Sequence, residues 1–132
     1  MKIKVISWNI WGGRYIDGII SLLKKADADI IALQEVIEDD DGGNTALTLA
    51  KALGYEYVLN LSTQMSSKWS GPVRATEKTI SFGNAILSRH RIISSNPLKL
   101  SERRIAIQAD IQVGATVVHV SSIHLKHQHV QN

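Results

Sequence analysis

The 132-residue sequence contains no cysteine, only two prolines and a single phenylalanine. Without cysteine the chain cannot form disulfides, thiolate metal sites or a cysteine nucleophile. No apolar run approaches the roughly 18 residues that a membrane-spanning helix needs, and the first residues lack the apolar segment of a secretory signal. We therefore expect a cytoplasmic protein by default, with a secreted protein whose leader has been removed as the alternative.

What is present suffices for one folded domain. Hydrophobic residues make up 44% of the chain and charged residues 20%. A chain of this length buries about two thirds of the surface that its unfolded form exposes. The composition therefore predicts a single domain over 1–132 that is held by its own core, and it argues against long disorder.

The net charge of +3 is small, but the charges are unevenly placed along the chain. Residues 26–57 contain eight acidic residues and one basic residue, whereas both flanking segments are basic. This distribution is typical of an ordinary solvated surface. It also fits a carboxylate-lined cation site beside a basic surface that attracts an anion such as phosphate.

Apolar spacing along the chain predicts six strands and two helices, together with a long polar loop. In chain order these are strand Lys2–Trp8, helix Ile16–Lys25, a short buried strand Ile30–Leu33, a helix from the N-cap Asn44 to Leu53, strand Tyr55–Leu61, loop Ser62–Lys78, and strands Thr79–Arg89, Ile105–Val113 and Thr116–Leu125. Strands that alternate with helices and then follow one another indicate an α/β protein. We expect a mixed sheet with helices on at least one face.

Two polar residues stand at the ends of the first two predicted strands. Asn9 precedes a glycine turn, where it could meet a ligand or simply close the loop as an Asx turn. Glu35 follows a buried apolar run, and a carboxylate there must be solvated, paired or bound to a metal. A hard cation such as Mg²⁺ takes one or two protein carboxylates, and the alternative is a solvent-facing strand end.

Two further candidates lie in the later strands. Asn84, in mid-strand beside Gly83, needs a hydrogen-bond partner if it is buried, or it marks an edge or a bulge. His124 could hydrogen-bond or protonate an anionic substrate oxygen, or serve only the structure. Guanidinium groups match phosphate geometry, so the candidate phosphate donors include Arg89, Arg91, Arg103 and Arg104.

Four short motifs contain these residues and follow one another from Val5 to Leu125. Together they resemble the endonuclease/exonuclease/phosphatase superfamily, which includes deoxyribonuclease I, repair nucleases, sphingomyelinases, inositol polyphosphate phosphatases and deadenylases. The motifs are Val5-Ile6-Ser7-Trp8-Asn9-Ile10, Ala28-Asp29-Ile30-Ile31-Ala32-Leu33-Gln34-Glu35-Val36, Gly83-Asn84-Ala85-Ile86-Leu87-Ser88-Arg89 and Ser122-Ile123-His124-Leu125.

The resemblance implies part of a four-layer α/β/β/α sandwich of the deoxyribonuclease I type and divalent-metal-dependent cleavage of phosphoester bonds. By this resemblance Glu35 is the ligand of Mg²⁺, with Mn²⁺ as the alternative ion. Asn9 is the catalytic amide beside metal and phosphate, His124 contacts the scissile phosphate, and Asn84 lies near the bound phosphate. The implied substrates are nucleic acids, phospholipids or inositol phosphates.

The sequence departs from the family in one respect. Members are longer, and their later part carries an Asp-x-Asn motif and a Ser-Asp-His motif, neither of which occurs here. We expect 1–132 to be a truncated, amino-terminal part that is inactive alone, with one sheet whose uncovered inner face drives self-association or binds a missing carboxy-terminal half. The alternative is a non-catalytic module that binds a phosphate ligand or a protein.

Overall fold

The computed structural model describes residues 1–62, 79–101 and 104–125, which form seven strands, two α-helices and a 3-10 turn. In chain order these are β1 (Val5–Asn9), η1 (Trp11–Gly13), α1 (Ile16–Ala26), β2 (Ile30–Asp39), α2 (Thr45–Leu53), β3 (Glu56–Leu61), β4 (Ile80–Ser88), β5 (Arg91–Lys99), β6 (Ile105–Val113) and β7 (Thr116–Ile123). The predicted loop 62–78 lies outside the described residues, apart from Ser62. No helix in the described part is long and apolar enough to cross a membrane.

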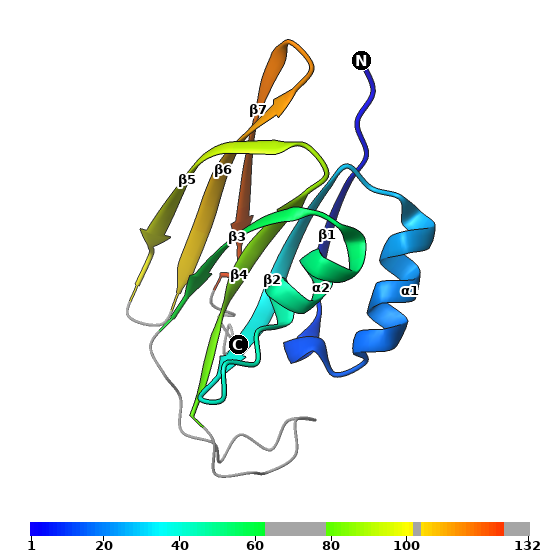
Figure 1. The fold of residues 1–132 in the computed structure, drawn as a ribbon. Helices are drawn as coiled ribbons and strands as arrows, with labels where there is room; N and C mark the ends of the chain where they lie inside the picture. The colour runs from blue at the N-terminus through cyan, green and yellow to red at the C-terminus, as the bar shows by residue number, and fades with distance from the viewer. Residues whose placement is uncertain (63–78, 102–103, 126–132) are drawn as a thin grey trace, which may run out of the picture.

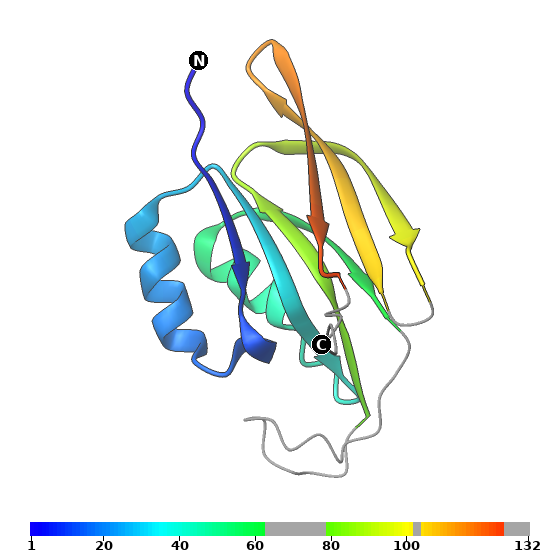
Figure 2. The same ribbon diagram turned by 180° about the vertical axis from the view of Figure 1, so that it is seen from behind.

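The described elements form three layers (Figures 1 and 2). One sheet has the order β1-β2-β4-β3, with β1 parallel to β2 and the other pairs antiparallel. Helices α1 and α2 lie on one face of this sheet, and a second, antiparallel sheet β5-β6-β7 lies on the other. The α/β class and the mixed sheet are thereby confirmed.

Helix α2 begins and ends as local chemistry predicts. The Asn44 side chain accepts a hydrogen bond from the Leu47 backbone at 3.0 Å, and Gly54 ends α2 in the left-handed conformation. A side-chain acceptor at the N-cap and a glycine after the last turn are the usual helix boundaries. The apolar stripe of α1 buries Ile19 and Leu23 against the sheet, which places this helix on the outer face.

The expectation of an uncovered inner sheet face is wrong. Ile30 and Ile86 of the first sheet are fully buried against the second sheet, in a cluster with Ile107 and Ile111 of β6. Burial of this apolar surface holds the two sheets together. The expected self-association therefore loses the physical basis that an open inner face would have provided.

The second sheet includes one strand that the hydrophobic pattern did not predict. Strand β5 carries the polar run Ser94-Ser95-Asn96-Pro97 and is mostly exposed. It lies at the edge of its sheet and pairs only with β6 among the described strands. A proline is tolerated on an edge strand, because its missing N–H need not serve a neighbour.

Asp29 ties the start of β1 to the turn between α1 and β2. Its carboxylate accepts from the Lys4 backbone N–H at 2.8 Å and lies 3.0 Å from Nε2 of His90. The backbone hydrogen bond from Lys4, followed by the side-chain bond to His90, lowers the pKa of Asp29 below its ordinary value. The folded protein therefore favours the ionised form of this group.

Replacing Asp29 with asparagine is expected to lower the free energy of unfolding at pH 7 by about 1 kcal/mol. A lowered folded pKa contributes stability above the unfolded value, and this contribution is lost as the pH falls through the folded value. The difference between wild type and variant should shrink as the pH falls below about 4. Urea unfolding across this range measures it, and a difference that grows on acidification would contradict the assignment.

Candidate active site

A row of amide side chains crosses the first sheet and closes the apolar space between the sheets. Strand register places Asn9, Gln34, Asn84 and Asn60 side by side on the four strands. Three of them donate to the second sheet. These bonds run from Gln34 to the Ser122 hydroxyl at 3.0 Å, from Asn84 to the Ile105 carbonyl at 2.6 Å, and from Asn60 to the Ala106 carbonyl at 2.9 Å. The site lies beyond this row.

Glu35 reaches the site because β2 contains a bulge. Ile31 and Leu33 face the helices, so regular alternation would direct Glu35 into the same buried layer. The register with β4 shifts between Gln34 and Val36, and Glu35 adopts a φ of 55°. Val36 then takes the helix-facing position, and the extra residue is displaced from the ladder.

The predicted strand Ile30–Leu33 was therefore too short, since β2 continues through the bulge to Asp39. Glu35 lies in the middle of this strand and not at its mouth. A positive φ is uncommon for a residue with a side chain, and such strain is concentrated at functional sites.

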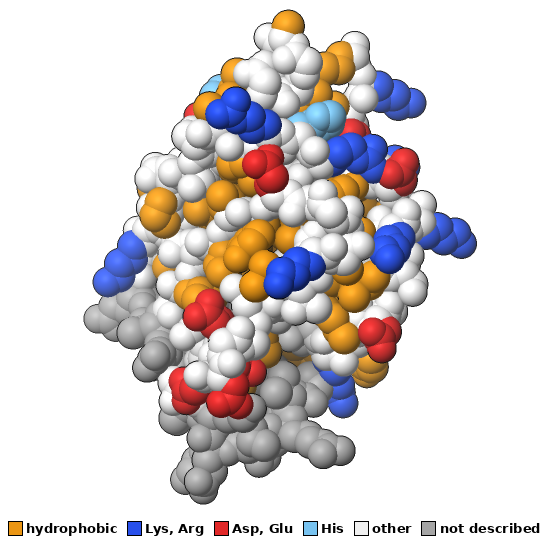
Figure 3. Space-filling view, in the orientation of Figure 1, with side chains coloured by type: hydrophobic (Ala, Val, Ile, Leu, Met, Phe, Trp, Pro, Cys, Tyr) orange, Lys and Arg blue, Asp and Glu red, His pale blue; other side chains and the backbone are white. Residues whose placement is uncertain are grey.

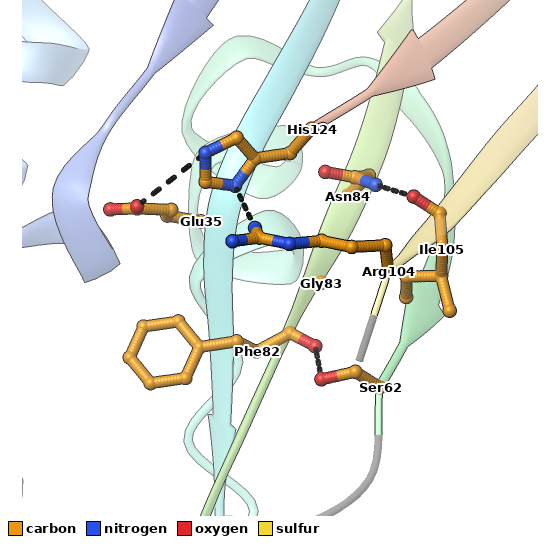
Figure 4. Close-up of a pocket in the computed structure, with 8 residues that line it drawn as sticks. All are labelled: Glu35, Ser62, Phe82, Gly83, Asn84, Arg104, Ile105 and His124. Atoms are coloured by element: carbon orange, nitrogen blue, oxygen red, sulfur yellow. Dashed lines mark hydrogen bonds and ion pairs between the residues drawn. The ribbon is translucent and has the colours of Figure 1, made fainter. Parts of the chain in front are cut away.

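Figure 4 shows the pocket into which Glu35 projects. It is lined by Glu35, Ser62, Phe82, Gly83, Asn84, Arg104, Ile105 and His124. His124 Nε2 lies 4.0 Å from the Glu35 carboxylate, and its Nδ1 lies 3.3 Å from the Arg104 guanidinium. An arginine can only donate, so His124 Nδ1 accepts and the ring proton is on Nε2, on the side of Glu35.

His124 and Arg104 reach the pocket by different routes. Alternation in β7 turns Ser122 inward to the Leu33 carbonyl, at 2.8 Å, and His124 follows on the same side just beyond the strand. Ile123 is exposed, as the alternation predicts. Arg104 precedes β6 and brings a permanent positive charge beside His124, into the pocket that Glu35 also lines, which suits an anion held together with a cation.

Asn84 is buried and joins the two sheets, which is the hydrogen-bond partner that a mid-strand amide needs. Its amide nitrogen faces Ile105, and its oxygen faces the opposite way, toward His124 (Figure 4). The amide nitrogen of Asn84 therefore serves the structure, whereas its amide oxygen faces the pocket.

Replacing Asn84 with alanine should lower the free energy of unfolding by about 2 kcal/mol, because the Ile105 carbonyl loses its donor between the sheets. The exposed Asn96 on β5 provides the matched control, and Asn96→Ala should change stability by less than about 0.5 kcal/mol. Urea unfolding of both variants tests this. Equal effects would contradict a clamp at Asn84.

Asn9 ends β1 and lies beside Gln34, the residue before Glu35, but it is not among the residues that line the pocket. Its side-chain oxygen accepts from the Trp11 backbone N–H at 3.1 Å. The Asx turn is thus present, and it shapes the turn after β1 next to the site.

The arginines proposed from the sequence as phosphate donors lie in different parts of the chain. Arg89 pairs with Asp27 and donates to the Tyr55 hydroxyl at 3.0 Å, at the end of β4 remote from the pocket. Arg91 begins β5 and is exposed, and Arg103 lies outside the described residues. Of the four arginines proposed from the sequence, Arg104 is the one found in the pocket.

The acidic middle of the sequence does not form a carboxylate-lined site in the described residues. Glu35 is its only acidic residue in the pocket. Figure 3 shows acidic side chains gathered where β2 leads into α2. There Asp39 accepts from the Gly43 backbone at 2.8 Å, and Asp40 accepts from the Thr79 backbone at 2.9 Å. These carboxylates stabilise the loop that follows β2 by accepting backbone hydrogen bonds.

The donor set of the pocket fits a hard divalent cation. Glu35 provides a partly exposed carboxylate, and the Asn84 amide oxygen faces toward His124 in the same pocket. The described residues contain no group of three or more histidine or acidic side chains gathered to hold a metal. Mg²⁺ typically binds one or two protein carboxylates and keeps waters and substrate oxygens as its other ligands, so the Glu35 carboxylate is a ligand that it accepts.

Two stacked sheets, helices on one outer face, and a polar site at one end of the space between the sheets define a deoxyribonuclease I type of α/β sandwich. The sequence pattern of the Endonuclease/Exonuclease/phosphatase family matches residues 6–125. The chain belongs to this family. No curated protein matches the sequence.

Solved structures share the fold. The chain is 22% identical to an endonuclease/exonuclease/phosphatase from Beutenbergia cavernae, with a TM-score of 0.78 over 93% of this chain and 38% of that one. A family protein from Leptotrichia buccalis is 18% identical, with a TM-score of 0.68 over 95% of this chain and 54% of that one. D. rerio TDP2, complexed with single strand DNA product, is 18% identical with a TM-score of 0.68 over 98% and 48%.

The chain thus spans between 38% and 54% of the length of these three structures. At such identities the likeness establishes the fold.

Proposed function

We propose that the pocket of Glu35, His124 and Arg104 binds a phosphoester group together with Mg²⁺ or Mn²⁺ and takes part in its hydrolysis. The observation that carries this proposal is the bulge in β2, which turns a carboxylate out of the buried layer to face a histidine and an arginine. A structural match, D. rerio TDP2, is complexed with single strand DNA product. Nucleic acid is therefore the favoured substrate over phospholipid or inositol phosphate.

Each side chain of the pocket has a role that its contacts allow. Glu35 would hold the cation, with the Asn84 oxygen nearby. When bound, the cation polarises a phosphoryl oxygen and offsets the charge that develops on it. His124 would donate its Nε2–H to a phosphate oxygen, and Arg104 would pair with the phosphate charge. Asn9, whose oxygen is taken by Trp11, would offer its amide nitrogen to the phosphate.

The described pocket has no evident group to activate water. Members of the family use the Asp-x-Asn and Ser-Asp-His motifs for this, and the sequence contains neither. We propose that 1–132 acts as a single domain that supplies the amino-terminal part of the site. Turnover would then require a carboxy-terminal part or a second copy of the chain.

The test measures two properties of the 132-residue chain. Electron paramagnetic resonance follows Mn²⁺ binding, and release of nitrophenol from bis(p-nitrophenyl) phosphate follows Mg²⁺-dependent turnover. Glu35→Gln should weaken Mn²⁺ binding at least tenfold, whereas the control Glu38→Gln, on the same strand outside the pocket, should not.

The outcomes distinguish hydrolysis by this chain from phosphate binding without hydrolysis. Turnover that disappears with a chelator and with Glu35→Gln supports hydrolysis by this chain. Mn²⁺ binding through Glu35 without turnover favours a phosphate-binding module or a partial site. Mn²⁺ binding that Glu35→Gln leaves unchanged contradicts the role given to this carboxylate.

A further inference from the structure

The turn after β1 carries two exposed aromatic rings with an arginine between them. Trp11 is 45% exposed and Tyr15 is 64% exposed. The Arg14 guanidinium carbon lies 4.8 Å from the centre of the Trp11 ring and 5.4 Å from the centre of the Tyr15 ring. We name these three residues the aromatic platform. Cation–π contacts of this kind hold the rings in a defined orientation without burying them.

The backbone beneath the platform is unusual and firmly held. Trp11 has a φ of 49°, which a bulky residue rarely adopts. The Trp11 N–H donates to the Asn9 side chain, and Gly13 packs so closely on Thr45 that an added Cβ would lie 2.6 Å from a methyl carbon. The turn is thus fixed in a strained form that presents the ring to solvent.

The turn that carries the platform begins next to Glu35, which lines the pocket. The Ile10 N–H donates to the Gln34 carbonyl at 3.1 Å, so the turn begins against the residue that precedes Glu35. In Figure 4 the ribbon of β1 and the turn that follows it passes beside Glu35. A nucleic acid whose phosphate is held by His124 and Arg104, with the cation at Glu35, would therefore lie next to the turn that carries these rings.

We propose that Trp11, Arg14 and Tyr15 form a stacking platform for an unpaired base of a single-stranded nucleic acid whose phosphate occupies the neighbouring pocket. This inference rests on the proposed function and names its substrate class. Flat aromatic faces and an arginine are the groups on which bases stack, and stacking requires bases that are not already paired in a duplex.

The surroundings favour a nucleic acid over a lipid surface. Among residues 10–18 the two rings are the only exposed large apolar side chains. Insertion into a bilayer would require further aliphatic side chains around them. A base needs only the rings and the guanidinium.

The test compares a fluorescent eight-nucleotide single strand of adenosines with an abasic strand of the same length, by anisotropy in the presence of a chelator. Both strands carry the same backbone charge, and the chelator makes binding independent of metal and turnover. We expect the wild-type chain to bind the base-bearing strand about tenfold more tightly. Trp11→Ala should abolish this preference, and Trp11→Phe should retain part of it.

Leu22→Ala, which removes an exposed apolar side chain on α1 outside the platform, is the matched control and should bind as wild type does. Circular dichroism verifies that each variant is folded. An equal affinity of the wild type for both strands, or a preference that survives Trp11→Ala, overturns the proposal. Trp11-dependent binding to phosphatidylserine vesicles without a base preference overturns it in favour of a membrane surface.

The two proposals can fail separately. A base preference that depends on Trp11 supports the platform even if Mg²⁺-dependent turnover is absent. Turnover that depends on Glu35 without any base preference overturns the platform and leaves the hydrolytic site standing.

Discussion

Gly83→Ala should prevent β3 from pairing with β4 and destabilise the protein by about 3 kcal/mol or more. A Cβ at this position would lie 1.9 Å from the Asn60 carbonyl oxygen and 2.9 Å from the Leu61 Cα. The atoms in the way belong to the backbone of β3, so no side-chain rotation can relieve the overlap. Gly83 also lines the pocket, and the displaced strand would disturb the site.

Gly18→Ala is the control for this substitution. Gly18 lies within α1, and an added Cβ there would meet no atom within 4 Å. Alanine in a helix interior should raise the free energy of unfolding by about 0.5–1 kcal/mol. Urea unfolding of the two variants should therefore give changes of opposite sign. A stable, fully folded Gly83→Ala chain would show that the β3–β4 contact is looser than the structure has it.

Glu35→Gly is expected to impair function and improve stability at the same time. Glycine adopts the φ of 55° that Glu35 holds in the bulge without steric cost, so the free energy of unfolding should rise by about 1 kcal/mol. The carboxylate is lost, so metal-dependent turnover, wherever the complete site is assembled, should fall about a hundredfold. Such a trade-off between stability and activity is typical of functional residues that occupy strained positions.

Glu35→Gln separates the two effects. It removes the charge but keeps a side chain at the strained position, so it should lose function without gaining stability. Thermal unfolding measures stability, and the Mn²⁺ and turnover assays measure function. If Glu35→Gly were less stable than Glu35→Gln, the bulge would not be strained by its side chain.

Much of the fold follows from local sequence signals. The Asn44 cap, the Gly54 stop and the apolar stripe of α1 predict both helices, because these features depend on residues within a few positions of one another. Strand β5 escapes such prediction, since its polar residues are permitted by its place at a sheet edge. Edge position is a property of the assembled sheet and leaves no clear periodic pattern.

For the candidate site, too, some residues could be predicted from the sequence and others could not. The sequence motifs identify Glu35 and His124, and the structure brings these two residues to one pocket. The motifs give no means of choosing Arg104 over Arg89, because both are arginines near strand ends. Only the pairing of β4 with β2 and β3 shows that Arg89 lies at the far end of the sheet. The exposed rings of Trp11 and Tyr15 also escaped the sequence analysis, since an aromatic residue in a sequence does not reveal its exposure.

By itself the sequence determined the class of fold, the helix boundaries and the family to which the chain belongs, because short-range spacing and motif order carry that information. Only the tertiary structure decided that β5–β7 cover the inner sheet face and that Asn84 clamps the sheets. It alone decided that Glu35 leaves the buried layer. Each of these depends on strand register between segments far apart in the chain, and register is settled by packing and hydrogen bonding across the sheets and not by neighbours in sequence.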